Sequence, residues 1–131
     1  MPTHTAATRD TPLSTPFKIG WLALLTISAL ATLGHIGLSL AMMEEATLFL
    51  GWAAFNLYST IVLYIPFRRG EPWAWYTTWL LVVGFAAPIL LTRESFVVWY
   101  IGAAGIMALS LLLTRAAFLQ KGSGAGWKRQ S

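Results

Sequence analysis

The chain has 131 residues, of which 56% are hydrophobic and only 11% are charged, and its formal net charge is +4. A water-soluble domain of this size could not cover its surface with so few charged side chains, so the composition indicates lipid as the surrounding medium. The chain contains no cysteine, which excludes disulfides, thiolate metal sites and a cysteine nucleophile.

Residues 1–16 are rich in threonine and proline and are expected to form a disordered cytoplasmic tail, and residues 120–131 a flexible basic one. Between them, residues 17–119 are predicted to form an all-α, integral membrane four-helix bundle. Its spans are expected at about 17–42, 46–67, 72–91 and 95–118, each long enough to cross ~30 Å of hydrocarbon. The connections are very short, which favours antiparallel neighbours in an up-down-up-down order.

Two sites in the sequence carry signals for helix ends. Ser14 or Thr15 can cap the first helix, with Pro16 in its first turn. The longest polar break in the apolar region reads Arg68-Arg69-Gly70-Glu71-Pro72. The two arginines suit the last turn of a helix, where carbonyls point outward, and Gly70 can take the left-handed conformation that ends it. Pro72 then fits the first position of the next helix, and the Glu71 carboxylate lies near that helix's unpaired N–H groups.

The distribution of positive charge predicts the orientation in the membrane. Eight of the nine basic residues fall on one side of the expected bundle, at Arg9, Lys18, Arg68, Arg69, Arg115, Lys121, Lys128 and Arg129. Arg93 alone falls on the other side. Because short cytoplasmic loops carry the excess of lysine and arginine, both termini and the Arg68 turn are expected to be cytoplasmic. The basic residues lie in the tails, in the turns or at the ends of the spans, and this distribution argues against nucleic-acid binding.

Aromatic residues gather at both ends of the spans and are expected to form belts at the lipid headgroups. The cytoplasmic belt comprises Phe17, Trp21, Tyr64, Phe67, Trp73, Trp75 and Tyr76, and the outer belt comprises Phe49, Trp52, Phe96, Trp99 and Tyr100.

His35 is the one histidine within a span, and ionisable residues at membrane depth are costly and often functional. The spacing Ala31-x-x-x-His35 resembles the pigment-binding histidine pattern of bacterial light-harvesting polypeptides, which implies a tetrapyrrole, haem or bacteriochlorophyll, ligated by His35. The alternative is a neutral histidine that hydrogen-bonds to a neighbouring helix. A haem held by two histidines of one chain is excluded because His4 lies in the tail.

Two further features could line a ligand site or a transport path. Asn56 lies near the middle of the second span with Thr60 one turn on, and such polar patches serve either as interhelical contacts or as ligand contacts. Pro88 interrupts the third span, where it bends the helix and can open a cavity. The structural alternative for each is simple helix packing.

Small side chains that allow close approach of helix backbones recur in the first and fourth spans, at Ser28, Thr32, Gly34, Gly37, Gly102, Ala104, Gly105 and Ala108. We expect them to pack inside the bundle or between protomers. The carboxylates Glu44, Glu45 and Glu94 stand where outer-side helices begin, which explains them without a metal ion. The sequence has no phosphate-binding glycine loop, zinc helix or serine nucleophile elbow, and no acid pair inside a span, so no enzyme and no metal site is expected.

The turn Arg68-Arg69-Gly70-Glu71-Pro72-Trp73-Ala74-Trp75 resembles the Arg-x-Gly-Glu-x-Trp-Ala-Trp turn of uncharacterised small bacterial four-span proteins. That resemblance implies a bacterial inner membrane and no particular activity. Small multidrug transporters have a similar length and span number, but they use a glutamate within the first span, and here no carboxylate precedes Glu44.

Three functions remain open. The first is a non-enzymatic structural or accessory subunit that acts through helix–helix packing, as a homo-oligomer or in a larger membrane complex. The second is a small-solute transporter or ligand-binding bundle that uses Asn56, Pro88 and His35. The third is tetrapyrrole binding through His35.

Overall fold

The computed structural model describes residues 14–91 and 97–119, and within these ranges the chain is helical apart from short turns, with no strand. The expected all-α class is therefore confirmed. The elements are α1 (Thr15–Ala41), the 3-10 turn η1 (Met43–Glu45), α2 (Ala46–Val62), the π-helical turn η2 (Leu63–Phe67), α3 (Pro72–Ala86), α4 (Pro88–Leu91) and α5 (Val97–Leu119). Residues 1–13 of the expected N-terminal tail, the C-terminal tail with Lys121, Lys128 and Arg129, and the third connection lie outside the described residues, whereas Thr15 and Pro16 belong to α1.

Three helical segments in the described part of the chain are long and apolar enough to cross a membrane: Thr15–Ala41, Met43–Phe67 and Val97–Leu119. The expected third span at 72–91 differs, because it is divided at Ala87 into the 15 residues of α3 and the 4 residues of α4. Pro88 explains the division, since proline cannot donate a backbone hydrogen bond to the preceding turn.

In the Arg68–Pro72 turn, Gly70 and Pro72 take the positions that the sequence predicts, whereas the arginines follow the helix: Arg68 is the C-cap of η2 and Arg69 lies in the turn. Gly70 has a φ of 71°, the left-handed conformation that ends a helix without steric strain. Glu71 is extended and Pro72 begins α3. The Glu71 carboxylate makes no cap hydrogen bond to the backbone; it accepts one from the indole N–H of Trp73, with 2.6 Å between Nε1 and Oε2.

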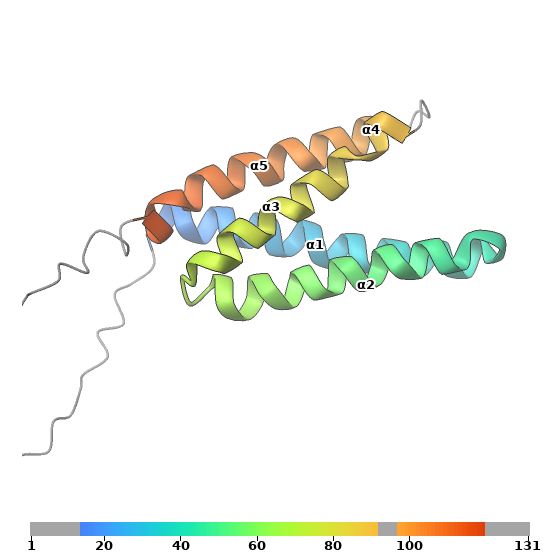
Figure 1. Cartoon of the computed structure of the whole chain (residues 1–131), viewed down its shortest axis with the longest axis horizontal. Coiled ribbons are helices and arrows are strands. Elements are labelled where there is room, and N and C mark those ends of the chain that lie inside the picture. Colours follow the sequence, from blue (N-terminus) through green and yellow to red (C-terminus); the bar gives the residue numbers. More distant parts are fainter. Residues whose placement is uncertain (1–13, 92–96, 120–131) are drawn as a thin grey trace, which may run out of the picture.

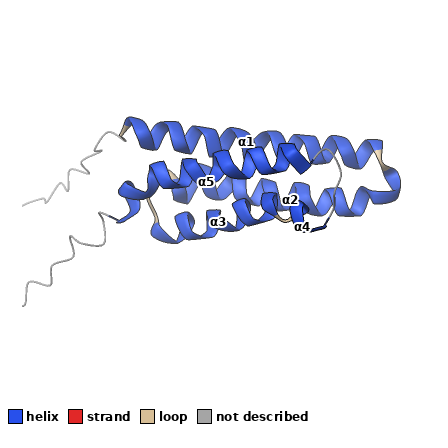
Figure 2. Ribbon diagram, turned by 90° about the horizontal axis from the view of Figure 1, so that it is seen from above, coloured by secondary structure: helices blue, strands red, loops and turns tan. Residues whose placement is uncertain are grey.

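The helices lie side by side along one axis, with α1 against both α2 and α5, and α3 against α5 (Figures 1 and 2). The start of α1, the α2–α3 turn and the end of α5 lie at the same end of the molecule (Figure 1). At that end the rings of Phe17, Phe67 and Phe118 form a cluster, with centroids 4.8 to 6.0 Å apart. The cluster thus joins three segments that are distant in sequence.

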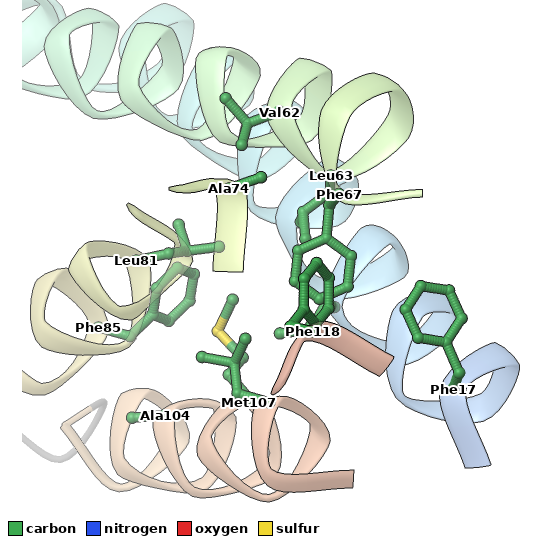
Figure 3. Close-up of a cluster of buried hydrophobic side chains, with 12 residues drawn as sticks. Phe17, Val62, Leu63, Phe67, Ala74, Leu81, Phe85, Ala104, Met107 and Phe118 are labelled. Atoms are coloured by element: carbon green, nitrogen blue, oxygen red, sulfur yellow. The ribbon is translucent and has the colours of Figure 1, made fainter. Parts of the chain in front are cut away.

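The apolar core continues from this cluster toward the middle of the helices (Figure 3). Its largest fully buried side chains beyond the phenylalanines are Leu24, Leu63, Leu81, Met107 and Leu111. Phe17 and Phe67 belong to this core, so they are not part of a lipid-facing belt. Tyr64, Trp73 and Tyr76 are exposed, as a belt requires.

Two belt tryptophans hydrogen-bond inward and connect helices. Trp21 on α1 donates from Nε1 to the carbonyl of Leu63 in η2 at 2.8 Å, and Trp75 on α3 donates to the carbonyl of Leu111 on α5 at 3.1 Å. The guanidinium of Arg68 lies 5.5 Å from the centre of the Trp21 ring, which is a cation–π contact.

The small residues divide into two groups. Ser28, Thr32 and Ala104 are buried and Ala108 is half-buried, so these face other helices. Gly34, Gly37, Gly102 and Gly105 instead have open space within the described chain where a Cβ would lie. Gly20, which the sequence did not single out, brings α1 close to the backbone of α5: a Cβ there would lie 2.7 Å from the carbonyl oxygen of Ser110.

Candidate functional site

His35 is buried on α1, with only 7% of its surface exposed. Its Nδ1 lies 2.7 Å from the carbonyl oxygen of Ala31, one turn earlier on the same helix. A carbonyl oxygen can only accept a hydrogen bond, so this short contact assigns the imidazole proton to Nδ1. In the neutral imidazole, the second ring nitrogen, Nε2, is then a hydrogen-bond acceptor.

Asn56 on α2 is fully buried beside His35. Its Nδ2 donates to the carbonyl of Trp52 at 2.9 Å and lies 3.2 Å from Nδ1 of His35. Its Oδ1 is buried and has no hydrogen-bond partner within the described chain. An unsatisfied polar atom of this kind is rare in folded proteins and marks this part of the α1–α2 interface as unusual.

A line of hydroxyl groups continues the α1–α2 interface away from His35. Ser28 donates to the backbone carbonyl of Asn56 at 3.0 Å and lies 2.9 Å from the hydroxyl of Thr60, which donates to the same carbonyl at 2.8 Å. Thr32 donates to the carbonyl of Ser28 at 2.9 Å. Thr60 is therefore part of a hydrogen-bond network that joins α1 to α2, together with Ser28 and Thr32, which were predicted to lie at helix contacts.

Aromatic rings of α2 cover one side of the His35 imidazole. The Trp52 ring lies 6.3 Å from it at 23°, a stacked arrangement, and the Phe49 ring also lies 6.3 Å away. These rings were expected in the outer belt; here they pack beside His35 and restrict the imidazole from the α2 side.

On the α5 side, His35 and Tyr100 together line a groove with a volume of about 340 Å³. The Tyr100 hydroxyl lies 3.3 Å from Nε2 of His35. The rest of the lining is apolar, with Ala31 and Gly34 as small residues on α1 and the larger side chains Ile27, Leu30, Leu38, Phe85 and Trp99. Leu30 and Trp99 are 63% and 81% exposed, so the groove opens to the outside of the helices.

The structure thus brings together some of the sequence candidates and not others. His35, Asn56 and Thr60 lie along one interface, whereas Pro88 begins α4 and is not among the residues that line the groove. Tyr100 was assigned to the outer belt and its place beside His35 was missed. The equal spacing of 18 residues from Phe17 to His35 on α1 and from Tyr100 to Phe118 on α5 becomes informative only once the Phe17–Phe118 contact is known, and that contact comes from the structure.

The described residues hold no group of three or more histidine, aspartate or glutamate side chains that could bind a metal ion. No protein-family model, curated protein or solved structure matches the chain. The function is therefore inferred from the geometry of this site alone.

Proposed function

We propose that this protein is a small, non-enzymatic membrane bundle that binds a lipid-soluble molecule in the groove between α1 and α5. The proposal takes α3 and α4 together as the third of four spans, since residues 72–91 extend about 30 Å at 1.5 Å per residue. It places the chain in a bacterial inner membrane, with both termini and the Arg68 turn in the cytoplasm. The positions of Phe17, Phe67 and Phe118 in one cluster support the placement of those three segments on one side.

The medium is inferred from what the helices expose. Large aliphatic side chains cover the outside of α1, including Leu30, Leu33 and Leu40, which is 73% exposed. In water such an exposed apolar surface would drive aggregation, whereas contact of the same side chains with lipid hydrocarbon carries no free-energy penalty. A groove on this surface is filled from the bilayer, so its ligand must dissolve in hydrocarbon.

The observation that carries the binding proposal is the pair of polar groups in the otherwise apolar groove. His35 Nε2 and the Tyr100 hydroxyl lie 3.3 Å apart among hydrocarbon side chains. Ligand pockets typically combine apolar walls with a few convergent polar groups that fix orientation. A pair that served only to join α1 to α5 would need no open volume beside it.

The test uses two glycines of α1 that differ in one respect. Gly34 lines the groove and Gly37 does not, and a Cβ at either position meets nothing within 4 Å. We expect wild-type protein and Gly37→Leu, purified in nanodiscs and extracted with organic solvent, to yield the same small molecule by mass spectrometry. Gly34→Leu fills the groove and is expected to lose it. Identical extracts from all three proteins would contradict the proposal.

A second candidate is the structural or accessory subunit, favoured by the outward glycines Gly34, Gly37, Gly102 and Gly105. Such positions allow a second helix to approach closely, in a homo-oligomer or a larger complex. Native mass spectrometry of Gly102→Leu and Gly105→Leu tests it: dissociation of an assembly present in the wild type supports it, and unchanged stoichiometry argues against it.

The other functions considered from the sequence have less support. A transport path built on His35, Asn56 and Pro88 requires the three to share a cavity, and Pro88 does not line the groove. A tetrapyrrole ligated by His35 requires an approach to Nε2, which the Tyr100 hydroxyl faces at 3.3 Å. An absorption spectrum of the purified protein without a Soret or near-infrared band would exclude the pigment.

A further inference from the structure

We propose that a second copy of this chain packs against the lipid-facing side of α1, and that the two Thr26 hydroxyl groups hydrogen-bond to each other across a two-fold axis. This interface is separate from ligand binding in the groove between α1 and α5, because Thr26 is not among the residues that line that groove. The proposal names one face and one partner for self-association of the bundle.

Thr26 lies near the middle of α1 and is exposed on the outside of the helices. A threonine within a helix ordinarily satisfies its hydroxyl by donating to the carbonyl one turn earlier. Thr32, Thr60 and Thr78 do so here, at 2.9, 2.8 and 2.7 Å. The Thr26 hydroxyl makes no hydrogen bond within the described chain. Hydrocarbon offers it neither a donor nor an acceptor, so at membrane depth this hydroxyl requires a partner from another molecule.

The side chains around Thr26 follow the spacing of a helix–helix seam. Steps of four and three residues alternate along one side of α1, through Ile19, Ala23, Thr26, Leu30 and Leu33, which we call the α1 seam. Ile19, Leu30 and Leu33 are 59%, 63% and 66% exposed. Leu24 and Ser28, on the other side of the helix, are buried in the bundle. A period of 3.5 residues keeps one stripe facing a second helix in a left-handed pair.

The partner that fits this seam is another α1. The basic residues orient every copy in the same way, so a two-fold axis between two copies runs along the membrane normal and their α1 helices are parallel. Equivalent positions meet in a parallel pair, which sets Thr26 against Thr26 of the second copy. A hydroxyl both donates and accepts, so two identical groups satisfy each other. The small side chain of Ala23, one turn away, lets the two backbones approach.

The surface beside the α1 seam is hollowed. Ile19, Ala23 and Thr26 line a shallow groove of about 480 Å³, together with Leu22 and Ile27 of α1 and Ile106 of α5. Thr26 carries the one polar side chain of this lining. A helix of a second copy can therefore place its side chains in the hollow and meet a single hydrogen-bonding group, which fixes the register of the pair.

Energy transfer between labelled copies in liposomes tests the interface. The chain has no cysteine, so donor and acceptor dyes can be attached at Glu44→Cys, an exposed position just after α1. We expect transfer that falls as lipid dilutes the protein. Thr26→Val keeps the shape and removes the hydroxyl, and should weaken the association about three- to tenfold. Thr26→Ser keeps the hydroxyl and should restore it.

Thr77→Val is the matched control, because the Thr77 hydroxyl already donates to the Trp73 carbonyl of its own helix at 2.8 Å. We expect it to associate like the wild type. Transfer that never exceeds random proximity would remove the second copy as the partner. Association that is equally strong in Thr26→Val, or is weakened as much in Thr77→Val, would remove the Thr26 contact.

Disulfide formation in native membranes locates the face. Thr26→Cys and Leu30→Cys should each form a covalent dimer under mild oxidation, whereas Leu25→Cys, which is half-buried and packs against the core, should not. Equal dimer yields at positions 25 and 26 would contradict the α1 seam. A Thr26→Cys product that contains a different polypeptide would replace the second copy with another partner and overturn the proposal.

Discussion

Nδ2 of Asn56 lies 3.2 Å from Nδ1 of His35, so two nitrogen atoms that both carry hydrogen face each other between α2 and α1. Rotating the Asn56 amide by half a turn would give His35 an acceptor but would set Oδ1 against the Trp52 carbonyl, which Nδ2 now contacts at 2.9 Å. Neither orientation satisfies this amide. The unsatisfied amide therefore contacts His35, one of the residues that line the groove.

Replacing Asn56 with leucine should not destabilise the protein. The substitution removes an Oδ1 that has no partner within the described chain, and it keeps the branched shape and the number of heavy side-chain atoms at a fully buried position. We expect the free energy of unfolding in mixed dodecyl maltoside–SDS micelles to stay the same or rise by up to about 2 kcal/mol. Asn56→Ala, which leaves a cavity, should lower it by about 2 kcal/mol. A loss in Asn56→Leu as large as that in Asn56→Ala would show that the amide is stabilising.

Gly20 should tolerate no side chain. A Cβ at this position would lie 2.7 Å from the Ser110 carbonyl oxygen and 2.9 Å from a Thr114 methyl group, so Gly20→Ala must push α1 away from α5. The expected loss of unfolding free energy is about 1–3 kcal/mol. Gly37→Ala is the matched control on the same helix and should be neutral or stabilising by up to about 1 kcal/mol. Equal effects at both positions would contradict the close approach at Gly20.

The indole of Trp21 should matter more to stability than that of Trp73. Trp21→Phe removes the 2.8 Å hydrogen bond to the Leu63 carbonyl and should lower the free energy of unfolding by about 0.6–2 kcal/mol. The bond from Trp73 to the Glu71 carboxylate is exposed, so Trp73→Phe should change stability by less than about 0.5 kcal/mol. Chemical unfolding of the two variants in parallel checks the order, and the reverse order would contradict an inward role for Trp21.

The proposed orientation can be tested without background labelling, because the chain has no cysteine. Arg69→Cys and Glu45→Cys place one thiol in each of two turns at opposite ends of the helices. In intact cells, an impermeant maleimide should label position 45 and spare position 69 until the cytoplasmic side is opened. Labelling of both positions from one side would refute the four-span topology.

Local rules in the sequence were enough to predict where helices begin and end. Gly70 takes the left-handed conformation and Pro72 begins α3, because the conformational freedom of glycine and the fixed φ of proline act within one or two residues. The division at Ala87 likewise follows from Pro88. These signals hold in water and in lipid alike.

The inward face of each helix was much harder to predict. In a soluble protein, hydrophobic periodicity marks the buried side, but in lipid both sides are apolar and that signal is lost. Gly34 and Gly102 were expected to pack inside the bundle or between protomers; within the described chain they face open space, which leaves only the second alternative, while the close contact at Gly20 was overlooked. The contact between His35 and Tyr100 depends on the register of α1 against α5, which only the three-dimensional packing fixes.

The π-helical turn η2 is the place where this chain can lose one residue without disturbing the packing of its helices. A π-turn closes its hydrogen bond over one more residue than an α-turn, so the segment 63–67, with Pro66 inside it, holds a surplus residue. Deleting one residue in the middle of α1 or α5 would rotate everything after it by about 100°. In η2 the same deletion would convert the turn to regular α-helix, with Asn56 and the Arg68 turn still in register. Natural variants one residue shorter should therefore carry their gap here.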